Sequence, residues 1–263
     1  MAKTTIQSIK SAKNTRKLAM ITAYDALFAA LIAPEADIVL VGDSLAMSFG
    51  GHSDTLSITF DEMIYHTKAV CRGAPDSLVV FDMPFGSYSS AKNALENAIR
   101  VYKETDASAV KIEGGAEKAE VIRRLTTNAI AVMGHIGLMP QYARQSGGFK
   151  VQGKDDAAVE KLIADAKAIE AAGAFAIVLE GVKANAAKSI SQSVGIPVIG
   201  IGAGSDCDGQ VLVWSDLLGF FEAFKPKFAR RYLEGATLAR EAIARFAADV
   251  RSGAFPSADE SYI

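Results

Sequence analysis

The chain has 263 residues, close to the usual length of one α/β barrel and long enough to bury a substantial core. Apolar residues make up 50% of it and charged residues 22%, which argues against a disordered chain. The 28 basic and 30 acidic residues give a formal charge of −2, which excludes a strong field for nucleic acid or an anionic membrane.

The cysteine count and the N-terminus bear on the compartment. Cys71 and Cys207 lie far apart and form no CxxC motif, so a reducing compartment fits better than a disulfide framework. No apolar run approaches the roughly 18 residues needed to span a bilayer. The basic, acid-free first 20 residues are typical of a transit peptide or of a solvated helix. Because they run directly into structured sequence, we expect the helix and a cytoplasmic protein.

Short apolar runs rich in β-branched residues recur along the chain, with helical segments between them. Such continuous runs are typical of parallel strands that are covered on both faces. We expect strands at 18–25, 37–44, 77–84, 108–115, 131–137, 175–181 and 196–204, with a weaker eighth at 215–221. Strand and helix units in this number favour a closed (β/α)₈ TIM barrel, with an open doubly wound sheet as the alternative.

Apolar residues between these runs are spaced by three to four positions, as in helices that pack on one face. Thr59 or Ser57 before Glu62, and Asp155 before an apolar run, are helix starts, while Gly173 suits a left-handed cap. The expected helices are 57–72, 89–104, 116–127, 155–172 and 183–193.

No linker or low-complexity tract interrupts the chain, so we expect residues 1–263 to form a single (β/α)₈ barrel domain with an N-terminal helix. Residues 228–252 predict an amphipathic C-terminal helix that ends at Gly253. The stretches 45–56 and 137–154 are predicted to be long mobile loops over the barrel mouth.

Polar residues end almost every predicted strand. In a parallel barrel the C-terminal strand ends meet at one mouth, so residues far apart in the chain can form one site there. One acid at such a place is most simply a helix cap, but five acids with a lysine and a histidine indicate a functional site. The residues are Asp25, Asp43, Ser44, Asp82, Lys111, Glu113, His135 and Glu180.

Three of these acids suit a hard metal ion. Asp43, Asp82 and Glu113 offer oxygen donors without a thiolate, and Mg²⁺ prefers this chemistry. Zinc fits less well because only one histidine, His135, ends a predicted strand. The other two histidines are interpreted as a loop residue and a helix-face residue: His52 and His66.

Lys111 and Glu113 lie two positions apart in one strand, so their side chains point to the same face. This pair is either a buried structural ion pair or a cation, beside a metal ligand, that binds a substrate carboxylate or stabilises an enolate.

Two glycine-rich segments do not form nucleotide sites. GIGAG at 200–204 fails to complete GxGxxG in either frame. The segment from Gly148 to Lys154 has Walker A spacing, but Asp155 stands where Ser or Thr would bind Mg²⁺.

An ordered set of motifs resembles the 3-methyl-2-oxobutanoate hydroxymethyltransferase family, also called ketopantoate hydroxymethyltransferase. The resemblance extends from about Thr5 to Gly253. The motifs are ITAYD (21–25), LVGDSL (40–45), YHTKAVCRGAP (65–75), VKIEGG (110–115), GHIGLMPQ (134–141), GGFKVQG (147–153), EAAGAFAIVLEGV (170–182), IPVIGIGAG (196–204) and DGQVLVW (208–214). The chain differs from the family pattern at Ala46, at Met139, before the second strand and within 215–228.

The resemblance implies a (β/α)₈ barrel of the phosphoenolpyruvate/pyruvate superfamily that assembles as a homodecamer. It implies transfer of a one-carbon unit from 5,10-methylenetetrahydrofolate to 3-methyl-2-oxobutanoate through a Mg²⁺-stabilised enolate, giving 2-dehydropantoate for pantothenate biosynthesis. One Mg²⁺ per subunit and the folate co-substrate are the implied cofactors.

The resemblance also assigns roles to residues of this chain. Asp43, Asp82 and Glu113 belong to the Mg²⁺ site, the two aspartates most directly. Glu180 is the proton acceptor. The substrate-binding residues are Asp43, Ser44, Asp82, Lys111 and His135.

Two rival functions remain at this point. One is another Mg²⁺-dependent barrel enzyme of α-keto acids, a lyase or a mutase. Such lyases carry a catalytic cysteine in a mouth loop, whereas Cys71 lies in a predicted helix and Cys207 follows the seventh strand. The other is a non-catalytic barrel, which would not need to keep so many charges buried.

Overall fold

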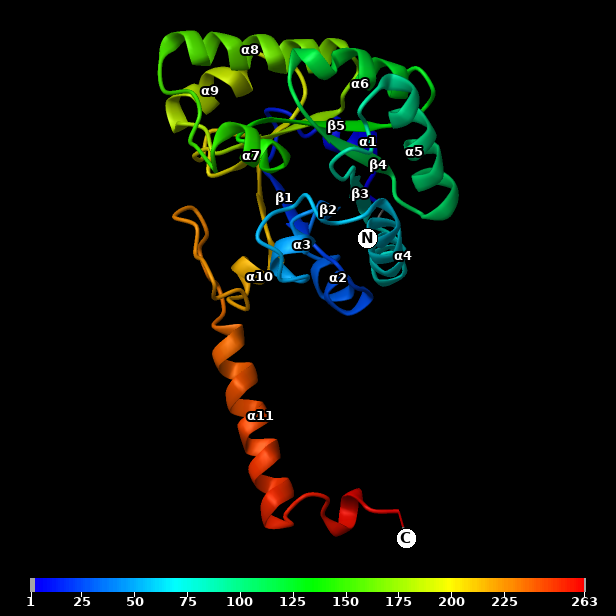
Figure 1. The fold of residues 1–263 in the computed structure, drawn as a ribbon, viewed down its shortest axis with the longest axis vertical. Coiled ribbons are helices and arrows are strands. Elements are labelled where there is room, and N and C mark those ends of the chain that lie inside the picture. The colour runs from blue at the N-terminus through cyan, green and yellow to red at the C-terminus, as the bar shows by residue number, and fades with distance from the viewer. Residues whose placement is uncertain (1–2, 263) are drawn as a thin grey trace. The chain divides into compact units, whose positions relative to one another are not determined.

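The computed structural model describes residues 3–262, so the outermost residues of the predicted domain, 1–2 and 263, lie outside the described part. The chain divides into two compact units, Met1–Val213 and Trp214–Ile263. The first unit is the barrel and the second carries the long C-terminal helix (Figure 1).

Eight parallel strands close into a barrel in chain order, which confirms the closed sheet and excludes the open one. The strands are β1 Leu18–Thr22, β2 Ile38–Val41, β3 Leu78–Asp82, β4 Ala109–Glu113, β5 Val132–Gly137, β6 Ala176–Glu180, β7 Val198–Ile201 and β8 Gly209–Leu212. Seven of them fall within predicted runs.

The eighth strand was predicted in the wrong place. Residues 215–217 belong to the short helix α10 (Trp214–Leu217), and β8 lies just before it. A Cβ atom on Gly209 would lie only 2.5 Å from the carbonyl oxygen of Leu18 in β1. The backbones of β1 and β8 approach so closely here that β8 needs glycine at position 209. With a glycine in it, β8 does not show the run of β-branched residues that marks a typical strand.

Apolar side chains fill the barrel. Met20, Leu40, Val80 and Val178 come from four different strands and belong to one buried cluster. Ile9 of α1 (Ile6–Lys10) is fully buried in the same cluster. The expected N-terminal helix therefore exists, and one of its residues packs against the barrel core.

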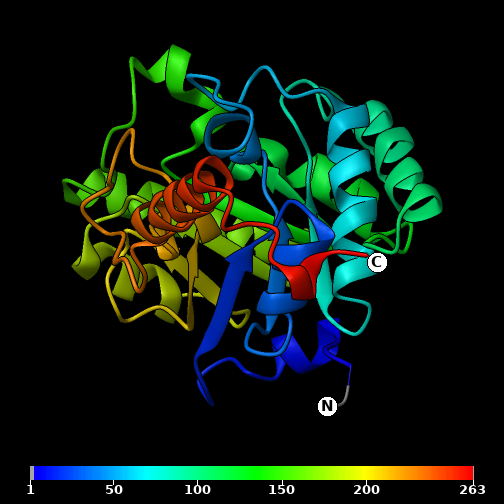
Figure 2. The same cartoon turned by 90° about the horizontal axis from the view of Figure 1, so that it is seen from below.

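The helices of the barrel unit start and end as predicted at most positions. Thr59 and Glu62 form a capping box, Asp155 caps α8, and Gly173 after α8 has φ +99°. Asp25 accepts from the backbone N of Phe28 and caps α2, so it is a structural residue. The helices are α2 Ala26–Ile32, α4 Phe60–Gly73, α5 Ala91–Glu104, η1 Ala116–Lys118, α6 Ala119–Thr126, α8 Asp156–Ala171 and α9 Ala184–Gln192. Figure 2 shows α4 and α5 side by side.

The two predicted loops contain short helices. The first includes α3 (Leu45–Ser48), and the second includes η2 (Pro140–Tyr142) and α7 (Ala143–Ser146). Arg144 links them, because its Nη2 atom lies 2.8 Å from Oδ2 of Asp54. The loops are thus joined to each other by an ion pair.

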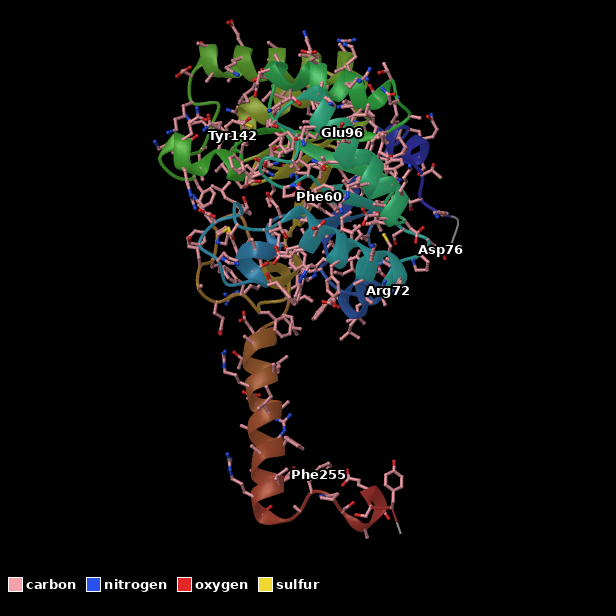
Figure 3. All side chains as sticks on the ribbon, turned by 45° about the vertical axis from the view of Figure 1, so that its right-hand side comes forward. Phe60, Arg72, Asp76, Glu96, Tyr142 and Phe255 are labelled. Atoms are coloured by element: carbon pink, nitrogen blue, oxygen red, sulfur yellow. The ribbon has the colours of Figure 1, made fainter. Side chains whose placement is uncertain are left out.

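The second unit contains α10, α11 (Gly235–Ser252) and η3 (Ala258–Glu260). The predicted terminal helix starts at Gly235 rather than at residue 228, and it ends at the left-handed Gly253 as predicted. Phe255, labelled in Figure 3, follows α11. Its ring lies edge-on to that of Phe246, with the ring centroids 5.4 Å apart. Among residues 3–262, no helix has the length and apolar character needed to cross a membrane.

Candidate active site

The register of the barrel brings the predicted site residues together. Asp82 of β3 pairs with Lys111 of β4, and Glu113 of β4 pairs with His135 of β5. Glu180 ends β6 beside the last residue of β5. Paired residues on parallel strands point to the same side of the sheet, so these side chains converge at the mouth.

Lys111 is the charged centre of this group. Its Nζ atom lies 2.6 Å from Oδ1 of Asp82 and 3.7 Å from Oε1 of Glu113. Burial alone acts to lower the pKa of Lys111, but the charges of Asp82, Glu113 and Asp43 raise it above its ordinary value. Lys111 is therefore a permanent cation, and it shares a face with Glu113 as the sequence predicted.

Asp43 lies just beyond β2 and faces Asp82. Its backbone N donates to Oδ2 of Asp82 at 3.2 Å. Burial and the neighbouring Asp82 charge raise the pKa of Asp43 to about 7. The next residue, Ser44, is hydrogen-bonded through its hydroxyl to that of Tyr24 at 2.9 Å and makes no side-chain cap for α3.

His135 is buried and neutral. Nε2 lies 2.9 Å from the carbonyl oxygen of Leu138, which can only accept, so Nε2 carries the proton. Burial and the charge of Lys111 lower the pKa of His135 well below its ordinary value. Its Nδ1 atom lies 3.5 Å from Glu113 Oε1, and its Nε2 atom lies 3.5 Å from Glu180 Oε2.

Glu180 is the most accessible carboxylate of the group. Its side chain is 19% exposed, whereas the side chain of Glu113 is 1% exposed. Burial raises the pKa of Glu180 to about 8, against the opposing effect of Lys111. Burial also raises the pKa of Glu113 well above its usual range. The pKa of Glu180 lies close to neutrality, which suits this carboxylate to accept a proton.

The group has more acids than bases. Asp43, Asp82, Glu113 and Glu180 face one permanent cation, Lys111, because His135 is neutral. In and beside this group, three buried polar atoms make no hydrogen bond to the described residues: Oγ1 of Thr55, Oε1 of Glu113 and Nδ1 of His135. Four clustered carboxyl groups, three of them with ionisation opposed by burial, and unpartnered polar atoms fit a divalent cation, which would favour the ionised carboxylates, with its water and substrate oxygens.

The three predicted metal ligands are not arranged as one ready ligand set. Within residues 3–262, no group of three or more His, Cys, Asp or Glu residues is placed to hold a metal ion. Mg²⁺ needs only one or two protein carboxylates, with waters and substrate oxygens completing its octahedron. Asp43 and Asp82 are neighbours in space and can supply these one or two carboxylates.

The sequence did not point to three further residues of this site. Gln141 and Tyr88 are buried and hydrogen-bonded to each other, and Thr55 is buried beside the mouth. All three lie in segments between strands, where no periodic pattern marks a side chain as inward-facing. The only sequence signal is the GHIGLMPQ motif, which ends at Gln141.

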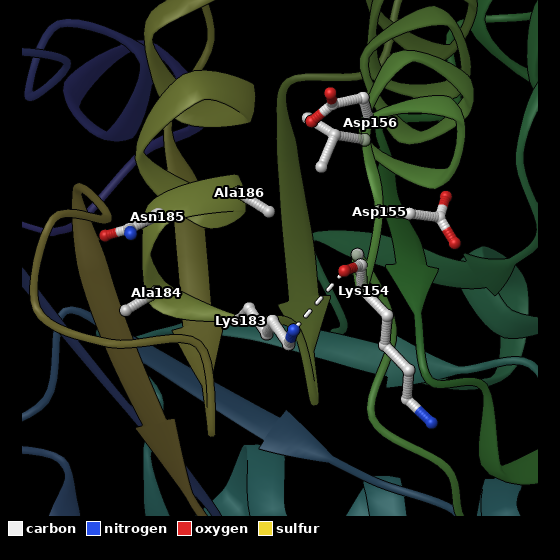
Figure 4. Close-up of a pocket in the computed structure, with 9 residues that line it drawn as sticks. Lys154, Asp155, Asp156, Lys183, Ala184, Asn185 and Ala186 are labelled. Carbon is white, nitrogen blue, oxygen red and sulfur yellow. Dashed lines mark hydrogen bonds between the residues drawn. The ribbon is translucent and has the colours of Figure 1, made fainter.

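A separate pocket of about 320 Å³ lies at the N-termini of α8 and α9, and none of the predicted site residues lines it. Lys183 Nζ donates to the carbonyl oxygen of Lys154 at 3.3 Å across this pocket (Figure 4). Asp155, which stands in the Walker-like segment, uses its carboxylate to cap α8. The segment is therefore a helix start, as its aspartate indicated.

A closed (β/α)₈ barrel with buried carboxylates, a lysine and a neutral histidine at its mouth defines an α/β-barrel enzyme built for acid–base chemistry. A family model described as ketopantoate hydroxymethyltransferase matches residues 3–258. The chain belongs to this family.

Two relatives are similar over nearly their whole length. The 3-methyl-2-oxobutanoate hydroxymethyltransferase of Wolinella succinogenes is 64% identical over 100% of both chains. The protein of that name from Aliarcobacter butzleri is 60% identical over 99% of this chain and 97% of its own.

Solved structures with the same fold are more distant. Phosphonopyruvate hydrolase, in complex with oxalate and Mg²⁺, has a TM-score of 0.62 at 15% identity and covers 99% of this chain and 93% of its own. The 2,3-dimethylmalate lyase, a PEP mutase/isocitrate lyase superfamily member, has a TM-score of 0.61 at 16% identity. The match covers 100% of this chain and 92% of the lyase chain. These likenesses show the barrel fold.

Proposed function

We propose that this enzyme transfers a hydroxymethyl group from 5,10-methylenetetrahydrofolate to 3-methyl-2-oxobutanoate, giving 2-dehydropantoate in pantothenate biosynthesis. The two relatives described above carry this name, and they match 100% and 99% of the chain at 64% and 60% identity. The observation that carries the mechanism is the accessible, high-pKa Glu180 next to a buried Asp–Lys–Glu cluster.

Asp43 and Asp82 would hold Mg²⁺, with Glu113 as a less direct member of the same site. When bound, the ion supplies a Lewis acid for the carboxylate and keto oxygens of the substrate. Lys111 places a fixed positive charge beside these oxygens. Ser44 and His135 contribute a hydroxyl and an imidazole to the substrate pocket.

Glu180 would take the proton from C3 of the oxo acid. The C3–H bond breaks, the proton moves to the Glu180 carboxylate, and the electron pair remains as an enolate. C3 then forms a bond with the methylene carbon of the folate, and the two bonds from that carbon to the folate nitrogens break. Water supplies the hydroxyl of the product and one proton, the proton taken from C3 supplies the other, and tetrahydrofolate leaves with both nitrogens protonated. The loops around α3 and α7, joined through Arg144 and Asp54, are positioned to limit the entry of other water.

One incubation tests the activity. The enzyme is mixed with the oxo acid, Mg²⁺ and methylenetetrahydrofolate, and the product is identified by mass spectrometry. We expect 2-dehydropantoate, and without folate we expect exchange of the C3 hydrogen in deuterium oxide. Cleavage or rearrangement of an α-keto acid with no folate requirement would instead establish the rival lyase or mutase. Absence of both products would contradict the proposal.

We further propose that the protein is a cytoplasmic homo-oligomer, a decamer as the family resemblance implies. Supporting this, α11 exposes Ile243 and Phe246, and α2 exposes Leu27 and Leu31. Large apolar side chains gathered on a helix face are typical of surfaces that become covered on assembly.

A further inference from the structure

We propose that Gln141 is a positioning residue that fixes the geometry of Asp43 and Glu113, and that Tyr88 acts through Gln141 by fixing its amide. The proposal rests on the Mg²⁺ site proposed above, because Asp43 and Glu113 are members of that site. Gln141 lies in η2, in the segment after β5, and is 4% exposed.

Gln141 contacts two carboxylates, one just beyond β2 and one at the end of β4. Its Nε2 atom donates to Oδ2 of Asp43 at 2.9 Å. Its backbone N donates to Oε2 of Glu113 at 3.1 Å. Gln141 therefore occupies one oxygen of each carboxylate with a hydrogen bond. The other oxygen of Glu113, Oε1, makes no hydrogen bond to the described residues and is left for a cation or its water.

The orientation of the amide is unambiguous. Nε2 also donates to the carbonyl oxygen of Met83 at 3.0 Å, and Oε1 accepts from the hydroxyl of Tyr88 at 2.5 Å. A flipped amide would bring its oxygen against the carbonyl oxygen of Met83, which cannot donate, and would turn its nitrogen away from Asp43. Both donors of the amide and its oxygen are thus engaged, and the group has one stable position.

Tyr88 completes the support. It is 4% exposed, and its single hydroxyl proton goes to Gln141. Lys118 lies over its ring, with Nζ 5.1 Å from the ring centroid. Tyr88 makes no hydrogen bond to a carboxylate in the described residues, so Gln141 is the hydrogen-bonded link between Tyr88 and the site. Partners of this kind orient metal ligands, and losing one costs about 10- to 100-fold in metal affinity.

The test measures Mg²⁺ binding by calorimetry, without substrate, beside the oxo-acid KM and kcat. Gln141→Met keeps the size of the side chain and the backbone N–H to Glu113 but removes both amide donors. We expect Mg²⁺ to bind about 10- to 100-fold more weakly. Tyr88→Phe keeps the amide but loses its anchor, so we expect a smaller weakening, about 3- to 10-fold. The double variant should bind no more weakly than Gln141→Met alone, because Tyr88 acts through Gln141.

Matched controls separate this role from simple destabilisation. Gln152→Met changes a glutamine whose amide, among the described residues, donates only to the carbonyl oxygen of Lys150, and Tyr65→Phe changes an exposed tyrosine. Both should bind Mg²⁺ like the wild type, and a melting scan confirms that every variant is folded. Wild-type affinity in folded Gln141→Met, or additive losses in the double variant, would overturn the proposal. A wild-type protein that binds no Mg²⁺ would instead overturn the metal site itself.

Discussion

At the scale of single residues, the two aspartates of the proposed metal site differ in what surrounds them. Asp82 is the nearest partner of the buried Lys111, at 2.6 Å. Asp43 has no lysine or arginine within ion-pair distance among residues 3–262, and it has Asp82 as a neighbour that raises its pKa. Both side chains should be needed to bind Mg²⁺, but only Asp82 is needed to keep Lys111 paired.

We therefore predict different effects of Asp43→Asn and Asp82→Asn. Both variants should lose Mg²⁺-dependent activity. Asp82→Asn should also destabilise the fold by about 3 kcal/mol, because it leaves a buried lysine without its main counter-charge. Asp43→Asn removes a repelled charge and should unfold no more easily than the wild type. Activity assays and denaturant unfolding measure the two effects, and full activity in either variant would refute its assignment.

The assignment of Glu180 as the base gives a second prediction. Glu180→Gln keeps the size and hydrogen bonding of the side chain but cannot accept a proton. Deuterium exchange at C3 of the oxo acid should fall by about 100-fold or more, while Mg²⁺ binding is retained. Turnover should fall with exchange, because both need the enolate. Exchange within about threefold of the wild-type rate would exclude Glu180 and shift the role to His135.

The raised pKa of Glu180 also affects stability. Its folded-state pKa of about 8 lies above the ordinary 4.5, so the folded protein holds this proton more tightly than the unfolded chain does. The resulting stabilisation is complete below about pH 4.5 and is lost as the pH rises through about 8. Glu180→Gln stays neutral throughout this range.

We therefore expect Glu180→Gln and the wild type, both freed of Mg²⁺, to unfold alike near pH 5. At about pH 8.5 the variant should be more stable by about 2 kcal/mol, a value reduced from the full linkage because the side chain is partly exposed. Calorimetric melting at the two pH values gives the comparison. A constant difference between the proteins at both pH values would show that Glu180 does not titrate in this range.

At the scale of elements, the N-terminal face of the barrel is held by a buried ion pair. Lys13, which follows α1, lies 2.7 Å from Oδ2 of Asp208, and both side chains are less than 10% exposed. Asp208, just before β8, also accepts from the backbone N of Val198 and the hydroxyl of Ser191. This cluster joins α1, α9, β7 and β8 at the end opposite the candidate active site.

Asp208→Ala should therefore destabilise the protein by about 3 kcal/mol, because it leaves a buried lysine and a backbone N–H without their partner. The KM for the oxo acid should not change, since stability residues of a barrel lie at the face opposite the active site. Arg16→Ala, which removes the exposed pair with Asp37, is the control and should cost about 1 kcal/mol or less. Equal costs for the two variants would contradict this reasoning.

Patterns that repeat along a strand were the most predictive. Lys111 and Glu113 share a face because strand side chains alternate, and the strand register then adds Asp82 and His135. Gln141 could not be predicted in the same way. It reaches Asp43 only because the segment after β5 folds back over the mouth, which depends on tertiary contacts rather than on local periodicity.

At the scale of the whole molecule, α11 carries a stripe of apolar residues. Ile243, Phe246 and Val250 are spaced by three and four positions and so share one helix face, and all three are exposed. The opposite face carries small side chains such as Ala248. A stripe of this kind is costly to leave in water, so we expect it to be covered in the assembled homo-oligomer.

The wild-type protein should therefore sediment as a large closed homo-oligomer, a decamer by the family resemblance, at micromolar concentration. Phe246→Asp places a charge within the apolar stripe and should shift the protein toward smaller species, because burying an unpaired carboxylate is unfavourable. Ala248→Asp adds the same charge to the opposite helix face and should leave the assembly intact. Sedimentation velocity measures all three proteins. A monomeric wild type would refute the homo-oligomer, and equal sedimentation of the two variants would exclude this stripe from the interface.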